Sequence, residues 1–362
     1  MIPVSQPFLP PIEEYNQLIS KIWDTKWLTN HGTFVQQLEH QLADHLHLAS
    51  IHFVNNGTIA LQLAIHSLAI ENEVITTPFS FVATTNSILW EKCKPVFVDI
   101  DPKTLCIDVD KIEEAITVKT EAIMATHVFG IPCNVEKIEK IARKYNLKVI
   151  YDAAHAFGVK YKDRSVLEYG DISTLSFHAT KLFHTVEGGA IINNTGGNLD
   201  YKLNLLRSFG FSGEQYITVG INAKNSEFHA AMGLCNIKYI NEIIGNRRKI
   251  TELYDSYFGN FFKKPFISGD IDYNYAYYPI IFETEDELLQ TQQKLRKHNI
   301  ETRRYFFPSL NNLAFIKEKY SCPISEDISN RILCLPLYSE LKLEDVEKIA
   351  KLIMGKKLVS SI

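Results

Sequence analysis

The chain has 362 residues and a formal net charge of −4, with 46% hydrophobic and 22% charged residues. This length is enough for two domains with a sizeable core, and the composition is that of an ordinary globular protein. The small net charge argues against a nucleic-acid-binding protein, which needs a strongly basic surface. The six scattered cysteines show no CxxC spacing. They predict neither a zinc site nor a disulfide framework, but reduced thiols in the cytoplasm.

The N-terminus and the apolar segments predict a cytoplasmic protein that works away from membranes. The opening segment, MIPVSQPFLPPIEEY, has no basic stretch followed by an apolar run, which a secretory signal would have. No window of the sequence approaches the length of apolar residues that spans a bilayer. We therefore expect neither a membrane nor a nucleic acid among its partners.

Apolar runs alternate with amphipathic segments over the first two thirds of the chain. Strands are predicted at 51–54, 73–78, 95–100, 121–129 and 147–154, and helices at 58–70, 81–92 and 135–146. Strands that alternate with helices indicate an α/β domain with a mostly parallel sheet. Because ligands of such sheets bind beyond the carboxyl ends of the strands, the residues just after the apolar runs are the candidates for a site.

The pattern changes in the last third of the chain. Residues 226–261 are strongly helical, and residues 270–362 are typical of a smaller α+β domain. Strands are predicted there at 275–282 and 300–307, and helices at 285–299 and 343–355. We therefore expect a large domain, residues 1–245, and a small C-terminal domain, residues 246–362, with a long helix across the boundary.

A carboxylate stands at the end of one predicted strand. Asp152 comes just after the apolar residues KVI, and burying its charge is costly unless a positive group meets it. The protonated ring nitrogen of pyridoxal 5'-phosphate is such a group, and a carboxylate beside it makes the ring an electron sink. A cap on the following helix is the structural alternative, and for Asp152 taken alone it is favoured.

Lys181 lies 29 residues after Asp152 and five after Ser176, in the segment STLSFHATKLFHTVEGGA. A lysine that attaches to a carbonyl cofactor must be neutral near pH 7, so its surroundings must lower its pKa. It then carries a proton between the amino-acid carbon and the cofactor. Most lysines in loops are solvated and have no such role, so the whole segment, and not Lys181 alone, supports this interpretation.

Two further turns fit the same cofactor. In NNGTIAL, a strand ends, Gly57 turns, and a helix begins whose amides, with the Thr58 hydroxyl, suit a phosphate group. In TTPFSFVATTNS, either Phe79 or Phe81 suits stacking on a planar ring. Each signal is weak alone, because strand–glycine–helix turns are common and either phenylalanine is equally suited to a core.

These four segments, in this order, resemble the DegT/DnrJ/EryC1/StrS sugar aminotransferases, a branch of the aspartate-aminotransferase fold (fold type I). The resemblance covers nearly the whole chain. Its motifs are WLTNHGTFVQQLE, PVFVDIDPKTLCID, GDISTLSFHATKLFHTVEGGA, GINAKNSEFHAAMGL and RRYFFPSL, which are highly specific together. The resemblance implies the same architecture as the pattern, a large α/β domain with a mostly parallel sheet and a smaller C-terminal α+β domain.

The resemblance implies a role for each residue of the cofactor site. Lys181 would bind pyridoxal 5'-phosphate covalently, and Asp152 would pair with its ring nitrogen. The other contacts are the phosphate ligands Gly57, Thr58 and Ser176, the ring-stacking Phe81, and His155 beside the ring hydroxyl. Family members are homodimers with shared active sites, and Asn222 matches an asparagine that reaches the phosphate from the neighbouring subunit. Lys181 also disfavours the family's dehydratases, which have histidine at that position.

The resemblance also implies the reaction. IPVSQPFLPPIEEY, VITTPFSFVAT and SFHATKLFHTVEGG are similar to members that transfer an amino group from L-glutamate to dTDP-4-keto-6-deoxyglucose in O-antigen (lipopolysaccharide) synthesis. Two alternative acceptors stay open, a 3-keto sugar on dTDP and an acetamido-4-keto sugar on UDP. A cofactor-binding homologue without turnover is a third interpretation, and the intact Lys181 and Asp152 argue against it.

The sugar contacts are the least determined part of the site. The candidates are Thr29, Asn30, His184, Glu187, Arg303, Arg304 and Tyr305. The two arginines suit a pyrophosphate, but a solvated basic pair is more common, and His184 is equally suited to a structural role. The chain departs from the usual family residues at Asn225, Ser309 and Asn311. Neither the packing near Asn225 nor the sugar contacts can therefore be copied from the family.

Overall fold

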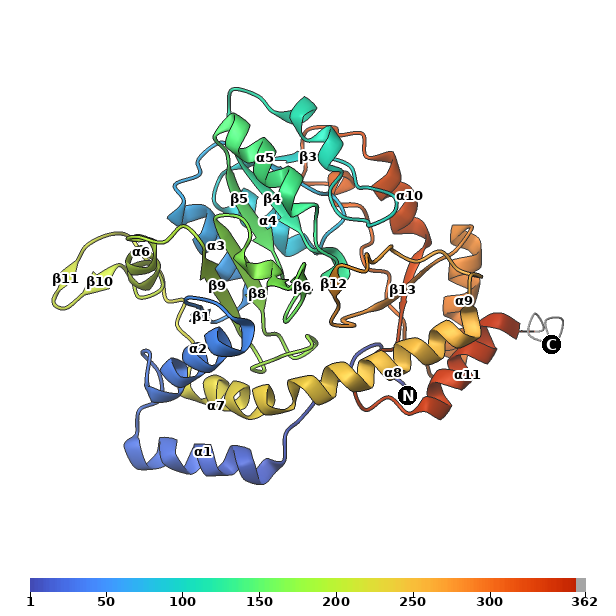
Figure 1. The fold of residues 1–362 in the computed structure, drawn as a ribbon, viewed down its shortest axis with the longest axis horizontal. Helices are drawn as coiled ribbons and strands as arrows, with labels where there is room; N and C mark the ends of the chain where they lie inside the picture. Colours follow the sequence, from blue (N-terminus) through green and yellow to red (C-terminus); the bar gives the residue numbers. More distant parts are fainter. Residues whose placement is uncertain (356–362) are drawn as a thin grey trace.

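A computed structural model describes residues 1–355, and its centre is a seven-stranded sheet with strand order β1-β9-β8-β5-β4-β2-β3 (Figure 1). The strands are β1 (His52–Val54), β2 (Glu73–Thr76), β3 (Lys94–Phe97), β4 (Thr120–Thr126), β5 (Lys148–Asp152), β8 (Ile172–Ser176) and β9 (Gly189–Asn193). Neighbours from β3 to β8 are parallel, whereas β9 is antiparallel to both β8 and β1. The predicted α/β fold with a mostly parallel sheet is confirmed.

Helices cover both faces of the sheet because its strands are apolar on both sides. Successive strand residues point to opposite faces. In β5, Ile150 packs in one apolar cluster with α3 (Gly57–Ser67), and its neighbour Val149 packs in another with α5 (Val135–Tyr145). The residues of α5 in this second cluster recur at helical spacing; they are Val135, Ile138, Ile141 and Ala142.

The other helices of the first two thirds are α1 (Ile12–Thr25), α2 (Thr33–Leu46), α4 (Val82–Trp90), α6 (Leu199–Leu206) and α7 (Glu227–Asn236). Helix α7 packs against α1 and α2 below the sheet, and α6 leads into a hairpin that projects from the body (Figure 1). The remaining short strands are β6 (Lys160–Tyr161), β7 (Arg164–Ser165), β10 (Phe211–Ser212), β11 (Gln215–Tyr216) and β12 (Ile271–Asp272).

A single helix, α8 (Ile240–Phe258), runs from the base of the large domain to the C-terminal part (Figure 1). There β13 (Tyr278–Ile281) and β14 (Ile332–Leu335) form an antiparallel pair. The helices of this part are α9 (Glu285–Lys297), α10 (Pro323–Arg331) and α11 (Leu343–Met354). The expected boundary at residue 245 falls inside α8 and stays a prediction.

One predicted strand is wrong. Residues 300–307 form no strand, and only two isolated bridges occur there, from Ile300 to Ile2 and from Arg303 to Cys334 of β14. The apolar residues of this segment satisfy contacts outside a sheet, since the buried Phe306 ring packs on Phe79 and Phe129 of the large domain. Tertiary packing therefore outweighs the local strand propensity of the segment.

Two further observations bear on the predicted location. Among residues 1–355, the helices include none that is both long and apolar enough to cross a bilayer. All six cysteines are buried and unpaired by disulfides. The cytoplasmic location itself stays a prediction.

A buried ion pair ties α2 to α6 and β1. Arg207, just after α6, pairs with Glu39 and donates to the carbonyl of Phe53 at 3.0 Å, and the Phe53 amide donates to Glu39 at 2.7 Å. Burial alone would raise the pKa of Glu39, but hydrogen bonds and charge from His31 and Arg207 lower it to about 2. Because this value lies below the ordinary 4.5, the ionised pair stabilises the fold above pH 4.5, and this stabilisation is lost as the pH falls toward 2.

Glu39→Gln should lower the free energy of unfolding by about 3–5 kcal/mol at pH 7, because it leaves a buried guanidinium unpaired. Chemical denaturation measures this, and the gap to wild type should shrink as the pH falls below 4.5. Glu139→Gln, which removes the exposed partner of Arg143, is the matched control and should change stability by less than about 1 kcal/mol. Equal losses in both variants would contradict the assigned role of the buried pair.

Candidate active site

One cavity of about 280 Å³ lies beyond the carboxyl ends of the central parallel strands. The large domain forms most of its wall, and Arg303, Tyr305 and Phe306 close it from the C-terminal part. Among the residues predicted from the sequence, its wall contains Gly57, Thr58, Phe81, Asp152, His155, Ser176, Lys181, Glu187, Arg303 and Tyr305. The sheet topology and the cover from the C-terminal part together gather residues that are more than 200 positions apart in the sequence.

A cradle for an anion lies where α3 begins. The Asn56 side chain caps this helix by accepting from the amide of Ile59 at 2.9 Å, and the first-turn amides point out along the helix axis. Gly57 lies so close to the end of β8 that a Cβ on it would be 2.8 Å from the Cβ of Ser176. The helix start, the Thr58 side chain and the Ser176 hydroxyl thus share one small space, which suits a phosphate group.

Asp152 is a buried carboxylate without a cationic partner. It is 5% exposed, its Oδ1 accepts from the Ala154 amide at 3.1 Å, and its Oδ2 accepts from the Thr84 hydroxyl at 2.6 Å. No lysine, arginine or histidine of residues 1–355 forms an ion pair with it. A buried carboxylate in this state suits a positively charged ring nitrogen.

Lys181 lies in the loop between β8 and β9 and is half-buried. Burial lowers the pKa of its amine, and Arg303 lowers it further, against the opposing effects of Tyr305 and Asp152. Its Nζ donates to the Tyr277 hydroxyl at 3.4 Å. The amine is therefore more often neutral than that of a solvated lysine, which is the state a nucleophile requires.

His155 is held as one tautomer. Its ring lies nearly parallel to the rings of Phe129 and Phe306, at interplanar angles of 7° and 6°. Burial, with a smaller effect of Lys181, lowers the pKa of His155 well below its ordinary value, so the ring is neutral. Because Nδ1 accepts from the Phe129 amide at 3.2 Å, Nε2 carries the proton and is a hydrogen-bond donor.

The two phenylalanines of TTPFSFVATTNS occupy different environments. Phe79 is fully buried and packs edge-on against Phe129 and Phe306. Phe81 precedes α4, lines the cavity and is 49% exposed. Of the two, only Phe81 is placed to stack on a bound ring.

The mouth of the cavity carries charges of both signs. Glu187 and Arg303 are exposed, and a Glu187 oxygen lies 3.5 Å from Nε2 of His178. The Arg303 guanidinium lies 4.7 Å from the centre of the Tyr305 ring. Burial raises the pKa of Tyr305 to about 12, so its hydroxyl stays protonated.

Two predicted sugar contacts point elsewhere. Arg304 donates to Glu285 at 2.7 Å and to the Asn330 carbonyl at 3.0 Å, which commits it to the C-terminal part. His184 is buried; its Nε2 lies 2.7 Å from the Phe8 carbonyl, and its Nδ1 accepts from the Val186 amide at 3.2 Å. Both side chains are therefore satisfied within the chain and lie outside the cavity wall.

Three other predicted residues lie on the surface, outside the cavity of this chain. Thr29 and Asn30 are exposed, and the Thr29 hydroxyl lies 3.5 Å from the Asn225 carbonyl. Asn222 is also exposed, and its backbone forms an isolated β-bridge with Ser208. The polar Asn225 side chain is buried and donates to the Glu187 carbonyl at 2.9 Å, so it supports the loop that carries a cavity residue.

The unusual residues Ser309 and Asn311 are buried below the mouth. The Ser309 hydroxyl donates to the Asn311 side chain at 2.7 Å, and Asn311 donates to Glu326 at 2.7 Å. They form a network that supports the segment after Tyr305 and do not line the cavity.

Two residues that contact Lys181 and Asp152 were not predicted from the sequence. Tyr277 is the hydroxyl that meets Lys181, and Thr84 is the donor to Asp152. Thr84 lies in the same segment as Phe81, three positions later in the predicted helix, and this nearness was the only available signal for it. Tyr277 lies 96 positions after Lys181, and no local pattern marks it.

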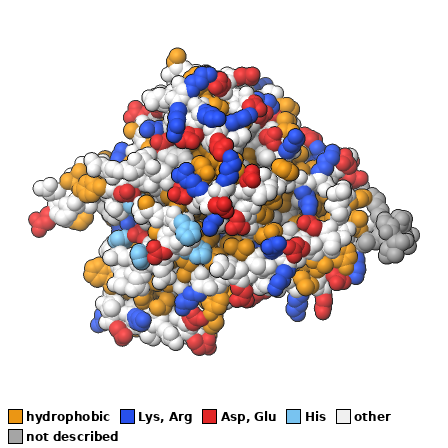
Figure 2. Space-filling view, viewed as in Figure 1, with side chains coloured by type: hydrophobic (Ala, Val, Ile, Leu, Met, Phe, Trp, Pro, Cys, Tyr) orange, Lys and Arg blue, Asp and Glu red, His pale blue; other side chains and the backbone are white. Residues whose placement is uncertain are grey.

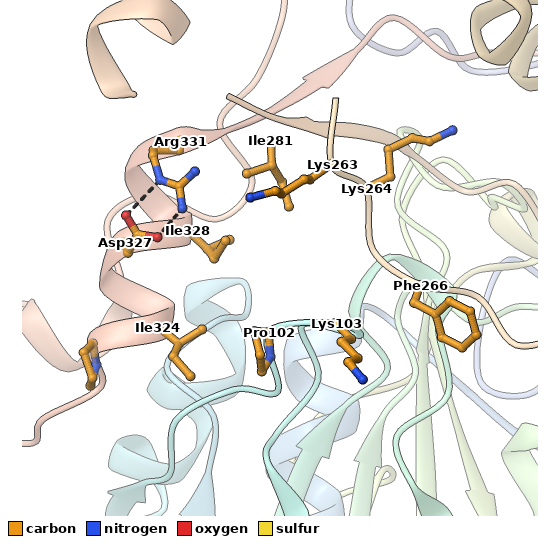
Figure 3. A pocket seen from close by; sticks show the side chains of 11 residues that line it. Pro102, Lys103, Lys263, Lys264, Phe266, Ile281, Ile324, Asp327, Ile328 and Arg331 are labelled. Atoms are coloured by element: carbon orange, nitrogen blue, oxygen red, sulfur yellow. Dashed lines mark hydrogen bonds and ion pairs between the residues drawn. The ribbon is translucent and has the colours of Figure 1, made fainter. Parts of the chain in front are cut away.

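A second, wider hollow of about 760 Å³ lies between the C-terminal part and the loop at Lys103 (Figure 3). Its basic side chains are largely paired, since Arg331 pairs with Asp327 and Lys264 pairs with Asp255. None of the residues predicted for cofactor or substrate lines it. The cavity at Lys181 is therefore the candidate active site.

A lysine and an unpaired carboxylate at the strand ends, beneath a small C-terminal cover, suit an aminotransferase. Residues 11–354 match the DegT/DnrJ/EryC1/StrS aminotransferase family, and the chain belongs to that family. The family and the enzyme class predicted from the sequence are thereby confirmed.

Individual relatives are similar over nearly their whole length. The chain is 42% identical to a dTDP-4-amino-4,6-dideoxy-D-glucose transaminase of Escherichia coli, over 98% of each chain. It is 34% identical to a GDP-perosamine synthase of Escherichia coli O157:H7, over 95% of each chain. Its fold matches the crystal structure of DesI in the presence of its TDP-sugar product, with a TM-score of 0.90 and 28% identity, over 99% of this chain and 95% of the other.

Proposed function

We propose that this enzyme transfers the amino group of L-glutamate to dTDP-4-keto-6-deoxyglucose, with pyridoxal 5'-phosphate as cofactor. The products are 2-oxoglutarate and dTDP-4-amino-4,6-dideoxyglucose. The observation that carries the proposal is one cavity with Lys181, whose pKa is lowered by burial, and the buried, unpaired Asp152. The similarity to the E. coli dTDP-sugar transaminase supports the choice of acceptor.

The residues of the cavity fit each part of the cofactor. Gly57, Thr58 and Ser176 would hold the phosphate, and Asp152 would pair with the ring nitrogen. The Nε2–H of His155 is a donor for the ring hydroxyl, and Phe81 would cover one face of the ring. When bound, the cofactor supplies an electron sink for the carbon that loses its proton.

The protein's own groups move and hold the protons. The neutral amine of Lys181 accepts the proton from the donor's α-carbon and later returns one to the sugar carbon. Tyr277, 3.4 Å from Nζ, orients this amine when it is free. Asp152 would pair with the ring nitrogen, held in one orientation because both of its oxygens accept hydrogen bonds. The buried Phe306 ring helps to exclude water from the site.

Gly57→Ala should weaken the affinity for pyridoxal 5'-phosphate by roughly tenfold or more, because the new Cβ would force the helix start away from Ser176. Absorbance titration of the purified protein measures the dissociation constant. Gly245→Ala is the matched control, since its Cβ would meet open space in α8, and it should leave the affinity unchanged. Unchanged binding in Gly57→Ala would mean that the phosphate lies elsewhere.

The reaction is tested by absorbance and by product mass. With cofactor bound, L-glutamate should bleach the visible-edge band, and dTDP-4-keto-6-deoxyglucose should restore it and gain one amino group. Lys181→Ala should lose turnover by several orders of magnitude, because the nucleophile and proton carrier are one residue. A wild-type band that ignores every amino donor would favour the non-catalytic alternative.

The acceptor alternatives are separated by the same assay. The panel includes a 3-keto sugar on dTDP, an acetamido-4-keto sugar on UDP and a 4-keto sugar on GDP. The proposed acceptor should have the highest kcat/KM. A higher value for any other member would overturn the sugar assignment while leaving the aminotransferase chemistry intact.

We infer that the working enzyme is a homodimer with shared active sites. A broad set of large apolar side chains is exposed on and just after α1, on α6 and around the projecting hairpin; it includes Trp23, Trp27, Tyr201, Phe209, Phe211, Tyr216, Ile217, Val219 and Ile221. Figure 2 shows apolar side chains on this hairpin at one edge of the molecule. Exposed apolar surface of this kind is typical of protein interfaces. Asn222 comes directly after Ile221, the last residue of this exposed set, and this position suits a contact with the phosphate site of the partner subunit.

Mixed dimers test whether each active site contains residues of both subunits. Asn222→Asp should impair activity, because it would place a negative charge beside the phosphate, and Lys181→Ala is inactive. In a dimer of one subunit of each kind, one site regains both native residues. Co-expression should therefore restore up to about a quarter of wild-type activity. Absence of recovery, with mixed dimers isolated by two affinity tags, would contradict a shared site.

A further inference from the structure

Three buried hydroxyls form a chain that ends on Asp152. Thr126 Oγ1 lies 3.0 Å from Ser80 Oγ, Ser80 Oγ lies 2.7 Å from Thr84 Oγ1, and Thr84 Oγ1 lies 2.6 Å from Asp152 Oδ2. All four side chains are at most 5% exposed. They come from β4, the loop after β2, α4 and β5, so the chain links separate elements of the domain.

The direction of these hydrogen bonds is set by their end point. An ionised carboxylate only accepts, so the Thr84 proton must point to Asp152. The Thr84 oxygen then accepts from Ser80, and the Ser80 oxygen accepts from Thr126. Every O–H dipole in the chain is therefore aligned toward the carboxylate, and such aligned bonds strengthen one another in a low-dielectric interior.

We propose that Thr84 is a positioning residue for the cofactor: its hydroxyl, oriented by Ser80 and Thr126, holds the Asp152 carboxylate turned toward the ring nitrogen. The proposal rests on the proposed function, since it assumes pyridoxal 5'-phosphate in the cavity. Thr84 itself does not line the cavity, whereas Ser80, Thr126 and Asp152 do. Thr84 thus acts on the cofactor only through the carboxylate.

Two hydrogen bonds fix the orientation of the Asp152 carboxylate. Thr84 donates to Oδ2 at 2.6 Å, and the Ala154 amide donates to Oδ1 at 3.1 Å. Because both oxygens are held, the carboxylate cannot rotate without losing a hydrogen bond in a buried place. Its orientation toward a bound ring therefore depends on the Thr84 hydroxyl.

The helix offers a matched pair of threonines for the test. Thr84 and Thr85 are adjacent in α4 and both fully buried, but the Thr85 hydroxyl has no hydrogen-bond partner within the described chain. Valine has nearly the same shape as threonine, so Thr84→Val and Thr85→Val remove one hydroxyl each with little change of packing. Thr84→Ser restores the hydroxyl without the methyl group.

The experiment measures the dissociation constant of pyridoxal 5'-phosphate by absorbance titration, and thermal unfolding without cofactor. Thr84→Val should bind roughly tenfold or more weakly, as expected for a lost hydrogen bond to a charged group. Thr85→Val should bind as wild type, and Thr84→Ser should recover most of the affinity. If Thr84→Val fails to fold, Ser80→Ala removes the donor to Thr84 and should weaken binding in the same direction.

Each outcome decides the proposal. Wild-type affinity in Thr84→Val would overturn it. Equal losses in Thr84→Val and Thr85→Val would also overturn it, and so would a failure of Thr84→Ser to recover the affinity. Failure of the proposed function would give a different result. The wild type itself would then lack the absorbance band of a cofactor bound to Lys181.

Discussion

The architecture of the site depends on one buried negative charge. Asp152 stands at the end of β5, between β4 and β8, where parallel pairing fixes its backbone on both sides. A carboxylate in such a place is costly unless a cation joins it. Within the described chain, the hydrogen-bond donors to this carboxylate are neutral, namely Thr84 and the Ala154 amide. On the proposed function, the positive group at this strand end would be the ring nitrogen of the cofactor.

The residues around Lys181 come from both parts of the chain. The pKa of Lys181 is lowered mainly by burial, and Arg303 and Tyr305, which contribute to it with opposite signs, come from the C-terminal part. Tyr277, which holds the Lys181 amine, comes from the same part. The surroundings of Lys181 are therefore completed by the C-terminal part, which the long helix α8 joins to the large domain.

The sequence revealed the residues that the sheet topology brings together and missed those that tertiary packing brings together. Asp152 and Lys181 could be predicted because each comes after an apolar strand, and the carboxyl ends of parallel strands meet at one edge. Thr84 and Tyr277 could not, because nothing local records that a helix hydroxyl faces β5 or that a distant tyrosine reaches the lysine. His184 lies three positions after Lys181, but its side chain is buried away from the cavity, with Nε2 2.7 Å from the Phe8 carbonyl. Nothing in the local sequence predicts this contact.

Residues 303–305 show how chemistry and specificity are divided. This segment is not a strand, yet it keeps the alternation of an extended chain. Arg303 and Tyr305 face the cavity, whereas Arg304 is held by Glu285 on the other side. The network of Ser309 and Asn311 runs instead to Glu326 of α10. On the proposed function, Asp152 and Lys181 serve glutamate and sugar alike. Discrimination between acceptors would then come from the mouth, where Arg303 and Tyr305 line the cavity.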